Sequence, residues 1–128
     1  MASDSLDSDA KKFQPEPGKA SIYINRKKAF LGAAETAQSV VDGRVIGWLT
    51  PGTYQLISVT PGEHTITLSG QSYDDNLKKF KIEEGKNYFF DVSGNLGFSE
   101  AEFNLKQIDE QEGQKCVAAS KRAEISTP

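Results

Sequence analysis

His64, Cys116 and the run Asp74-Asp75-Asn76 have the side chains of this sequence best suited to chemistry. His64 is the single histidine of the chain and follows a Pro61-Gly62 turn. A transition-metal site usually takes about three or four histidine or cysteine ligands, and no second histidine or nearby cysteine is present. A neutral imidazole satisfies one donor and one acceptor locally. We therefore predict that His64 serves the turn and is neither a metal ligand nor a catalytic base.

Cys116 is the single cysteine, which excludes an intramolecular disulfide. A nucleophilic thiol needs an adjacent base or a lowered pKa. Cys116 instead lies between Lys115 and Val117, far along the sequence from His64. We predict that it packs as a small apolar residue.

The run Asp74-Asp75-Asn76 offers clustered oxygen ligands, but it lacks the alternate spacing and the closing glutamate of an EF-hand loop. We interpret it as a solvated turn and predict no metal. Ser93 to Gly97 has loop glycines without the lysine and helix of a phosphate-binding loop. We predict no cofactor and no enzymatic activity; a small hydrolase with dispersed carboxylates is a third hypothesis.

The chain is of a length for one small domain, and this domain must position the residues named above. Its 128 residues carry 15 basic and 18 acidic side chains, a net charge of −3. This balance does not favour nucleic acid, which selects clustered basic surfaces. No apolar run is long enough to span a bilayer. We predict a flexible tether over residues 1–19, a domain over 20–122 and a disordered tail over 123–128.

Alternating apolar residues between turn signals recur through the middle of the chain. This pattern predicts about seven to eight short strands, in an immunoglobulin-like antiparallel β-sandwich. Asp109 with Glu112 resembles a capping box and predicts a short helix to about Lys121. The residues that we assign to structural turns are Asp42, Gly43, Pro61, Gly62, His64 and Gly85.

Aromatic side chains on a sheet face or loop often anchor a partner or a sugar. Phe89 lies on the strand face opposite Tyr88 and Phe90, so it either faces a partner or belongs to a sheet buried on both faces. The residues that we predict as a possible interface are Trp48, Tyr54, Phe89 and Phe98.

Several segments resemble families of bacterial envelope β-domains. Residues 61–66 (Pro-Gly-Glu-His-Thr-Ile) are similar to the P-G-x-H hairpin of PEGA-type domains and of a bacterial domain-of-unknown-function family found largely in lipoproteins. Residues 42–47 resemble the N-G-K-x-x-G hairpin of envelope domains, and residues 83–88 resemble the E-x-G-K-x-Y step of the second family. The opening strand at 22–24 and the acidic helix at 110–121 also match that family.

The resemblance implies a non-catalytic sandwich on the bacterial cell envelope, periplasmic or tethered to the outer membrane by a lipidated cysteine. Residues 1–19 contain no such cysteine, and they do not have a signal-peptide pattern. The envelope expectation therefore requires a removed leader; otherwise the chain is cytoplasmic. The leading hypothesis is a binding or spacing module for an unknown protein or envelope component. The alternative is a cytosolic or secreted interaction module without a lipid anchor.

Overall fold

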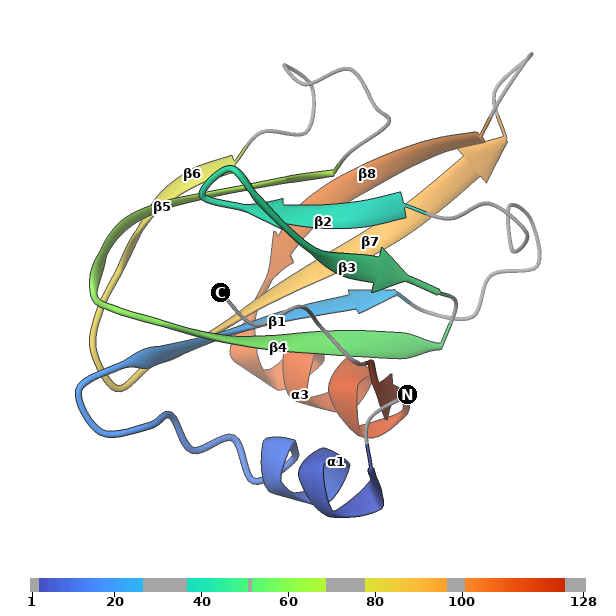
Figure 1. The fold of residues 1–128 in the computed structure, drawn as a ribbon. Helices are drawn as coiled ribbons and strands as arrows, with labels where there is room; N and C mark the ends of the chain where they lie inside the picture. Colours follow the sequence, from blue (N-terminus) through green and yellow to red (C-terminus); the bar gives the residue numbers. More distant parts are fainter. Residues whose placement is uncertain (1–2, 27–36, 51, 69–77, 97–100, 124–128) are drawn as a thin grey trace.

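Short strands separated by tight turns assemble into two facing β-sheets (Figure 1). The computed structural model describes residues 3–26, 37–50, 52–68, 78–96 and 101–123. In these residues one sheet has five strands, in spatial order β8 (Ala101–Ile108), β7 (Asn87–Leu96), β1 (Ala20–Arg26), β4 (Thr53–Val59) and β9 (Lys121–Arg122). The other has four, in the order β3 (Arg44–Leu49), β2 (Ala37–Val41), β5 (Gly62–Leu68) and β6 (Lys78–Ile82). The predicted all-β sandwich is confirmed.

The β2–β3 hairpin is closed by the two residues Asp42 and Gly43. Their φ angles are 53° and 81°, so both residues adopt the left-handed conformation that a type I′ turn requires. Aspartate and glycine tolerate this region better than most residues, which explains their place here. The hairpin carries one irregularity, a shift of register between Ser39 and Val40 that leaves Ile46 as the extra residue of β3.

Strand direction differs from the antiparallel sandwich that the sequence predicts. β1 pairs antiparallel with β4 but parallel with β7, and β4 pairs parallel with the short β9. Alternation of apolar residues identifies the buried face of a strand but carries no information on the direction of its neighbours. Residues 93–96, which have the composition of a loop, continue β7 and pair with β8.

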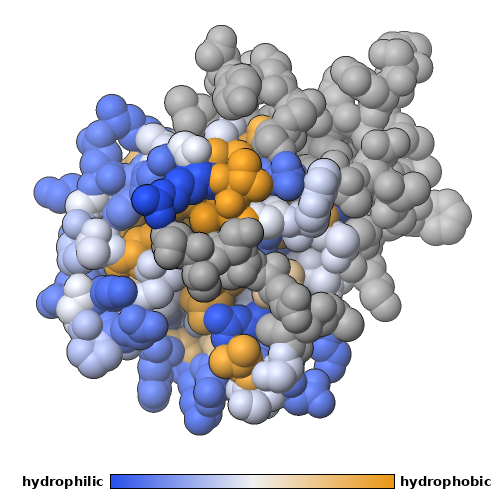
Figure 2. Space-filling model, in the orientation of Figure 1, coloured by the Kyte–Doolittle hydropathy of each residue, from blue (hydrophilic) through white to orange (hydrophobic). Residues whose placement is uncertain are grey.

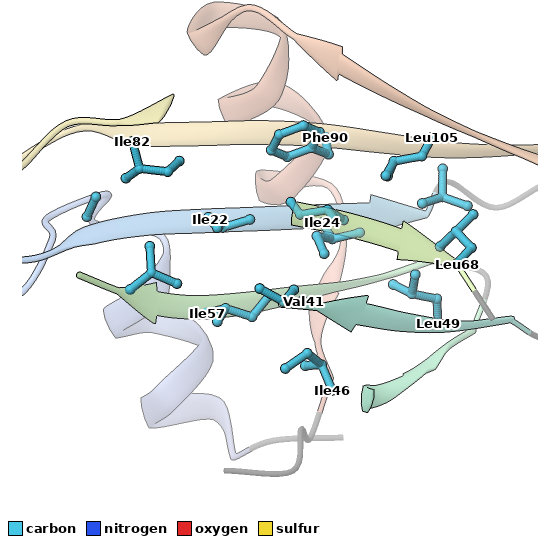
Figure 3. Close-up of a cluster of buried hydrophobic side chains, with 14 residues drawn as sticks. Ile22, Ile24, Val41, Ile46, Leu49, Ile57, Leu68, Ile82, Phe90 and Leu105 are labelled. Atoms are coloured by element: carbon cyan, nitrogen blue, oxygen red, sulfur yellow. The ribbon is translucent and has the colours of Figure 1, made fainter. Parts of the chain in front are cut away.

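The main core fills the space between the two sheets (Figure 3). Side chains of β1, β4 and β7 point from the five-stranded sheet toward side chains of β2, β3 and β5. Full burial of each large apolar side chain contributes roughly 1.5–3 kcal/mol. The buried members of this core are Ala20, Ile22, Ile24, Val41, Ile46, Leu49, Ile57, Val59, Ile66, Leu68, Ile82, Phe90, Val92 and Leu105.

Polar contacts inside the sandwich join the two sheets. The Ser39 hydroxyl of β2 donates to the Gln55 side-chain carbonyl of β4, and both residues are fully buried. At one end of the core, Arg26 Nη1 of β1 donates to the Leu49 carbonyl of β3 at 2.6 Å. Buried polar groups of this kind are costly unless they are paired, so these two bonds favour one alignment of the sheets.

Two helices cover the outer face of the five-stranded sheet (Figure 1). They are α1 (Asp4–Ala10) and α3 (Glu110–Ala118). A second apolar cluster lies beneath them, with Ala10 and Val117 of the helices packed against aromatic residues of the sheet. As a result every residue of β1 is buried, as expected for a strand in a sheet covered on both faces.

The structure differs from the sequence prediction at both ends of the domain. Residues 3–19, predicted as a flexible tether, form α1 and a connecting segment that packs on the sheet. The predicted C-terminal helix is present with Asp109 as its N-cap, but it ends at Ala118, and β9 follows. Ala123, assigned to the disordered tail, is buried, and its backbone N–H donates to the Tyr54 carbonyl at 2.8 Å.

Candidate functional site

A polar latch holds α1 against the sheet and against β9. Its centre is the carboxylate of Asp7, which accepts hydrogen bonds from the Tyr54 hydroxyl at 2.6 Å and from Lys11 Nζ at 3.0 Å. The backbone N–H of Arg122 donates to the same carboxylate at 3.1 Å. Lys11 also donates to the Ser120 carbonyl at 2.8 Å, so the latch joins the two ends of the domain. We call these five residues the N-terminal latch.

Titration of the latch follows from this geometry. Burial tends to raise the pKa of the Asp7 carboxyl, but the hydrogen bonds from Tyr54, Lys11 and the Arg122 amide, with the Lys11 charge, lower it below 3.8. Burial and the bond to Asp7 raise the pKa of Tyr54. Burial also raises the pKa of Tyr23 to about 12, and its hydroxyl donates to the Ala10 carbonyl at 2.8 Å. The carboxylate of Asp7 and the neutral phenols of Tyr54 and of neighbouring Tyr23 are therefore each committed to a structural hydrogen bond at pH 7.

His64 joins two turns at the opposite side of the sandwich. Its Nδ1 lies 2.5 Å from Asp42 Oδ2 in the β2–β3 turn, and its Nε2 lies 2.7 Å from the Thr60 carbonyl in the β4–β5 turn. The second oxygen of Asp42 accepts from the Thr65 backbone N–H at 2.8 Å. Both ring nitrogens of His64 and both carboxylate oxygens of Asp42 are thus engaged in these contacts.

An apolar patch lies on the outer face of the β2–β3 hairpin. Val45 and Trp48 of β3 have exposed fractions of 48% and 55%, and Val40 of β2 is the cross-strand partner of Val45. β3 is an edge strand of the four-stranded sheet, so the patch borders the rim of the sandwich. Figure 2 shows hydrophobic residues gathered over this hairpin, next to hydrophilic ones. We call Val40, Val45 and Trp48 the hairpin patch.

The predicted interface residues separate into three groups. Trp48 is exposed, whereas Tyr54 and Phe89 are buried, which corrects their assignment to an interface. Both point to the outer face of the five-stranded sheet, where α1 and α3 cover them; the Phe89 ring stacks on Tyr23 at 4.9 Å between centroids. Phe98 lies outside the described residues.

The remaining predicted residues show ordinary structural environments. Cys116 is buried on α3, with its Sγ 3.8 Å from Glu112 Oε1. Gly62 begins β5 directly after the β4–β5 turn, with φ of 132°, and Gly85 lies in the turn between β6 and β7, with φ of 78°. Asp74, Asp75 and Asn76 lie outside the described residues. Within the described part of the chain, no group of three or more histidine, cysteine, aspartate or glutamate side chains has the arrangement of a metal site. The helices described there are too short or too polar to span a bilayer.

The latch is the feature that sequence reasoning missed. A local signal was present, because Ser3 precedes an acidic first turn and its side chain accepts from the Leu6 N–H at 3.3 Å as an N-cap. Leu6, Ala10 and Phe13 also recur at helical spacing. Of the partners of Asp7, Lys11 lies four residues away, but Tyr54 and Arg122 lie 47 and 115 residues away along the chain, so no local pattern reveals them.

Fold and site together define a class: a small β-sandwich with one helix-covered face and an apolar patch on a hairpin of the other sheet. Residues 16–104 match the family described as "Protein of unknown function (DUF2846)", and the chain belongs to this family. The prediction of a domain-of-unknown-function family is thereby confirmed. The chain is also 33% identical over 119 residues to an uncharacterized protein of Haemophilus influenzae, an alignment that covers 92% of this chain and 70% of the relative. No solved structure matches the chain.

Proposed function

We propose that this protein is a non-catalytic binding module of the bacterial cell envelope and that the hairpin patch contacts a protein partner. The observation that carries the proposal is the pair Val45 and Trp48, which are large, apolar and about half exposed on an edge strand. Tryptophan is enriched among the residues that dominate binding energy in protein interfaces. The outer face of the five-stranded sheet is already occupied by α1 and α3.

Binding is favoured over spacing by the position of the two ends of the domain. Arg122 Nη1 of β9 donates to the Leu6 carbonyl of α1 at 2.9 Å, and the Arg122 backbone bonds to Asp7. The chain therefore enters and leaves the domain at one place. An in-line spacer needs its ends on opposite sides, whereas a pendant module presents its far surface to a partner.

The environments of the candidate titratable groups within the described residues support a non-catalytic role. A general base or nucleophile must lie within reach of a substrate, whereas four candidate side chains in the described part of the chain are directed at partners within the fold. His64 is bonded at both ring nitrogens, Asp42 at both oxygens, and Asp7 by three donors. Cys116 is buried on α3. These groups stabilise turns and helices in the arrangement described.

The envelope location rests on the resemblance of the Pro61-Gly62-Glu63-His64 hairpin to envelope lipoprotein domains, and the bacterial relative agrees with a bacterial setting. Anchoring by a lipidated cysteine in the native precursor is part of this proposal. The alternative is an interaction module without an anchor, in the cytosol or secreted. Cell fractionation of the product of the native gene separates the two.

Site-specific photo-crosslinking in living cells tests both parts of the proposal. A photo-reactive amino acid replaces Trp48, Val45 or, as the matched control, Leu6 of α1, which has the same exposed fraction of 48% as Val45. We expect one protein to be captured from positions 45 and 48 and not from position 6, in the envelope fraction. The purified partner should bind Trp48→Ala at least about tenfold more weakly than Leu6→Ala, a difference of about 1.4 kcal/mol.

Capture of the same protein from all three positions, or equal affinity of the two alanine variants, would contradict the assignment of the surface. Recovery of the partner with the cytosolic fraction would contradict the envelope location. Each half of the proposal therefore has its own failing result.

A further inference from the structure

We propose that protonated His64 is a clamp that fixes the β2–β3 turn to the β4–β5 turn, and that its loss of a proton loosens the hairpin that carries the hairpin patch. The clamp itself stands on geometry alone; only its consequence for binding rests on the proposed function.

The geometry demands a proton on each ring nitrogen. Nδ1 faces a carboxylate oxygen at 2.5 Å and Nε2 faces a backbone carbonyl at 2.7 Å. Neither oxygen can donate, because an ionised carboxylate and a carbonyl are acceptors only. A neutral imidazole has a single N–H, so deprotonation loses one bond and places a nitrogen lone pair against an oxygen. The His64 side chain has an exposed fraction of 11% and the Asp42 side chain one of 43%, so water can replace the lost bond from the Asp42 side but has little access to the ring.

The charges around the ring agree with this arrangement. Burial lowers the pKa of His64, but the bonds to Asp42 and to the Thr60 carbonyl, with the Asp42 charge, outweigh it and raise the pKa above 6.5. On β6, Phe80 is the cross-strand partner of His64, and Lys79 and Lys81 flank Phe80 on the opposite face of the sheet.

The other charged side chains near His64 either pair with each other or face solvent. Glu63, beside His64 on β5, pairs with Lys79 at 3.0 Å, and Arg44 of β3 is exposed. Asp42 is therefore the charge that bonds to the ring.

The turn that the clamp holds is the closing turn of the hairpin. Asp42 bonds to Thr65 through its backbone N–H at 2.9 Å and through its side chain at 2.8 Å, next to the His64 contact. Val45 lies three residues after Asp42 on β3, so release of the turn changes the part of the hairpin that bears the patch. The clamp is complete below pH 6.5 and is lost as the pH rises through the folded-state pKa.

An NMR titration of the full chain between pH 5 and 9 tests the clamp without any partner. We expect His64 to titrate above 6.5 with both ring nitrogens protonated below that midpoint. The amides of Gly43 and Thr65 should shift with the same midpoint. The exchange protection of the Thr65 amide, which donates to Asp42 Oδ1, should fall by about tenfold for each unit by which the pKa exceeds its ordinary value, after correction for the intrinsic pH dependence.

The matched variants are Asp42→Asn, which removes the charge at nearly constant size, and Glu63→Gln, which removes a charge that does not bond to the ring. We expect Asp42→Asn to lower the His64 midpoint and to abolish the response of Gly43, and Glu63→Gln to leave both unchanged. A His64 midpoint at or below 6.5 in the wild-type chain would overturn the clamp. So would Gly43 and Thr65 amides that do not shift with that midpoint. Neither result depends on whether the variants fold. Failure of the crosslinking experiment would leave this titration intact.

Discussion

Asp7 shows how one carboxylate fixes a short helix that its own sequence would not stabilise. A helix of seven residues is far below the length that is stable alone in water. The Asp7 side chain has an exposed fraction of 12% and accepts bonds from a phenol, an ammonium group and a backbone amide. Hydrogen bonds to a charged group contribute about 1.5–3 kcal/mol, more than those between neutral groups. The segment is therefore ordered by long-range contacts and not by helix propensity.

Paired tyrosine substitutions test this argument at the residue scale. Tyr54→Phe removes the donor to the Asp7 carboxylate, and Tyr23→Phe removes a donor to the neutral Ala10 carbonyl. In urea unfolding at pH 7 we expect Tyr54→Phe to lose about 1.5–3 kcal/mol and Tyr23→Phe about 0.5–1.5 kcal/mol.

The pH dependence of this difference has a definite sign. The folded-state pKa of Asp7 is lowered, so its contribution is present above 3.8 and is lost as the pH falls through the folded-state pKa. The excess cost of Tyr54→Phe should shrink over that acid range. Equal costs for the two variants at pH 7 would show that the Asp7 carboxylate has no special role.

At the scale of elements, Gly113 explains how α3 approaches the sheet. A Cβ atom at this position would lie 2.1 Å from Phe89 Cγ. Glycine lowers helix stability by about 1 kcal/mol relative to alanine, which is the only effect visible in the sequence. The structure shows what offsets this cost: the helix lies close enough to bury the Phe89 ring and Val117 in the outer apolar cluster.

Gly113→Ala should therefore destabilise the domain despite the better helix propensity of alanine. We expect a net loss of about 1–3 kcal/mol from overpacking against Phe89, measured by thermal or urea unfolding. Gln111→Ala on the exposed side of α3 is the control and should change stability by less than about 0.5 kcal/mol. The double variant Phe89→Ala/Gly113→Ala should be less unstable than the sum of its two parts. A stabilised Gly113→Ala variant would mean that the close approach is not needed.

The features that could be predicted from the sequence are those encoded by neighbouring residues. The Asp42-Gly43 turn, the strand alternation and the Asp109 N-cap are encoded within a few residues, and the structure contains all three. The burial of Phe89 depends on α3, and that of Tyr54 on α1 and β9, so their spacing within a strand could not decide between an interface and a core. The two bonds of His64 likewise join positions 42, 60 and 64, which only the folded sheets bring together.

At the scale of the whole molecule the two sheets have different roles. In the five-stranded sheet, β1 is buried on both faces, between the central core and the helices, and the aromatic side chains Tyr23, Tyr54 and Phe89 pack in the outer apolar cluster of the domain. The four-stranded sheet carries the hairpin patch on β2 and β3 and lysine side chains on β6 at the other edge. Lysines on an edge strand discourage pairing with other chains. The β6 edge therefore disfavours such pairing, whereas the β3 edge carries the apolar hairpin patch. Residues 3–19 must therefore belong to the domain, because Ala10 and Phe13 pack on the cluster that contains Tyr23 and Tyr54 and would otherwise leave these rings uncovered.

The most direct test of that requirement is the free energy of unfolding of the full chain compared with a chain that lacks residues 1–13. Removal of α1 and Phe13 deletes the packing of Ala10 and Phe13 and the bonds to Asp7, Ala10 and Phe13. We predict a loss of at least about 3 kcal/mol in urea unfolding, together with binding of a hydrophobic dye to the uncovered aromatic cluster. A change below about 0.5 kcal/mol, with no dye binding, would show that the segment is a tether and that the outer sheet face is open to a partner.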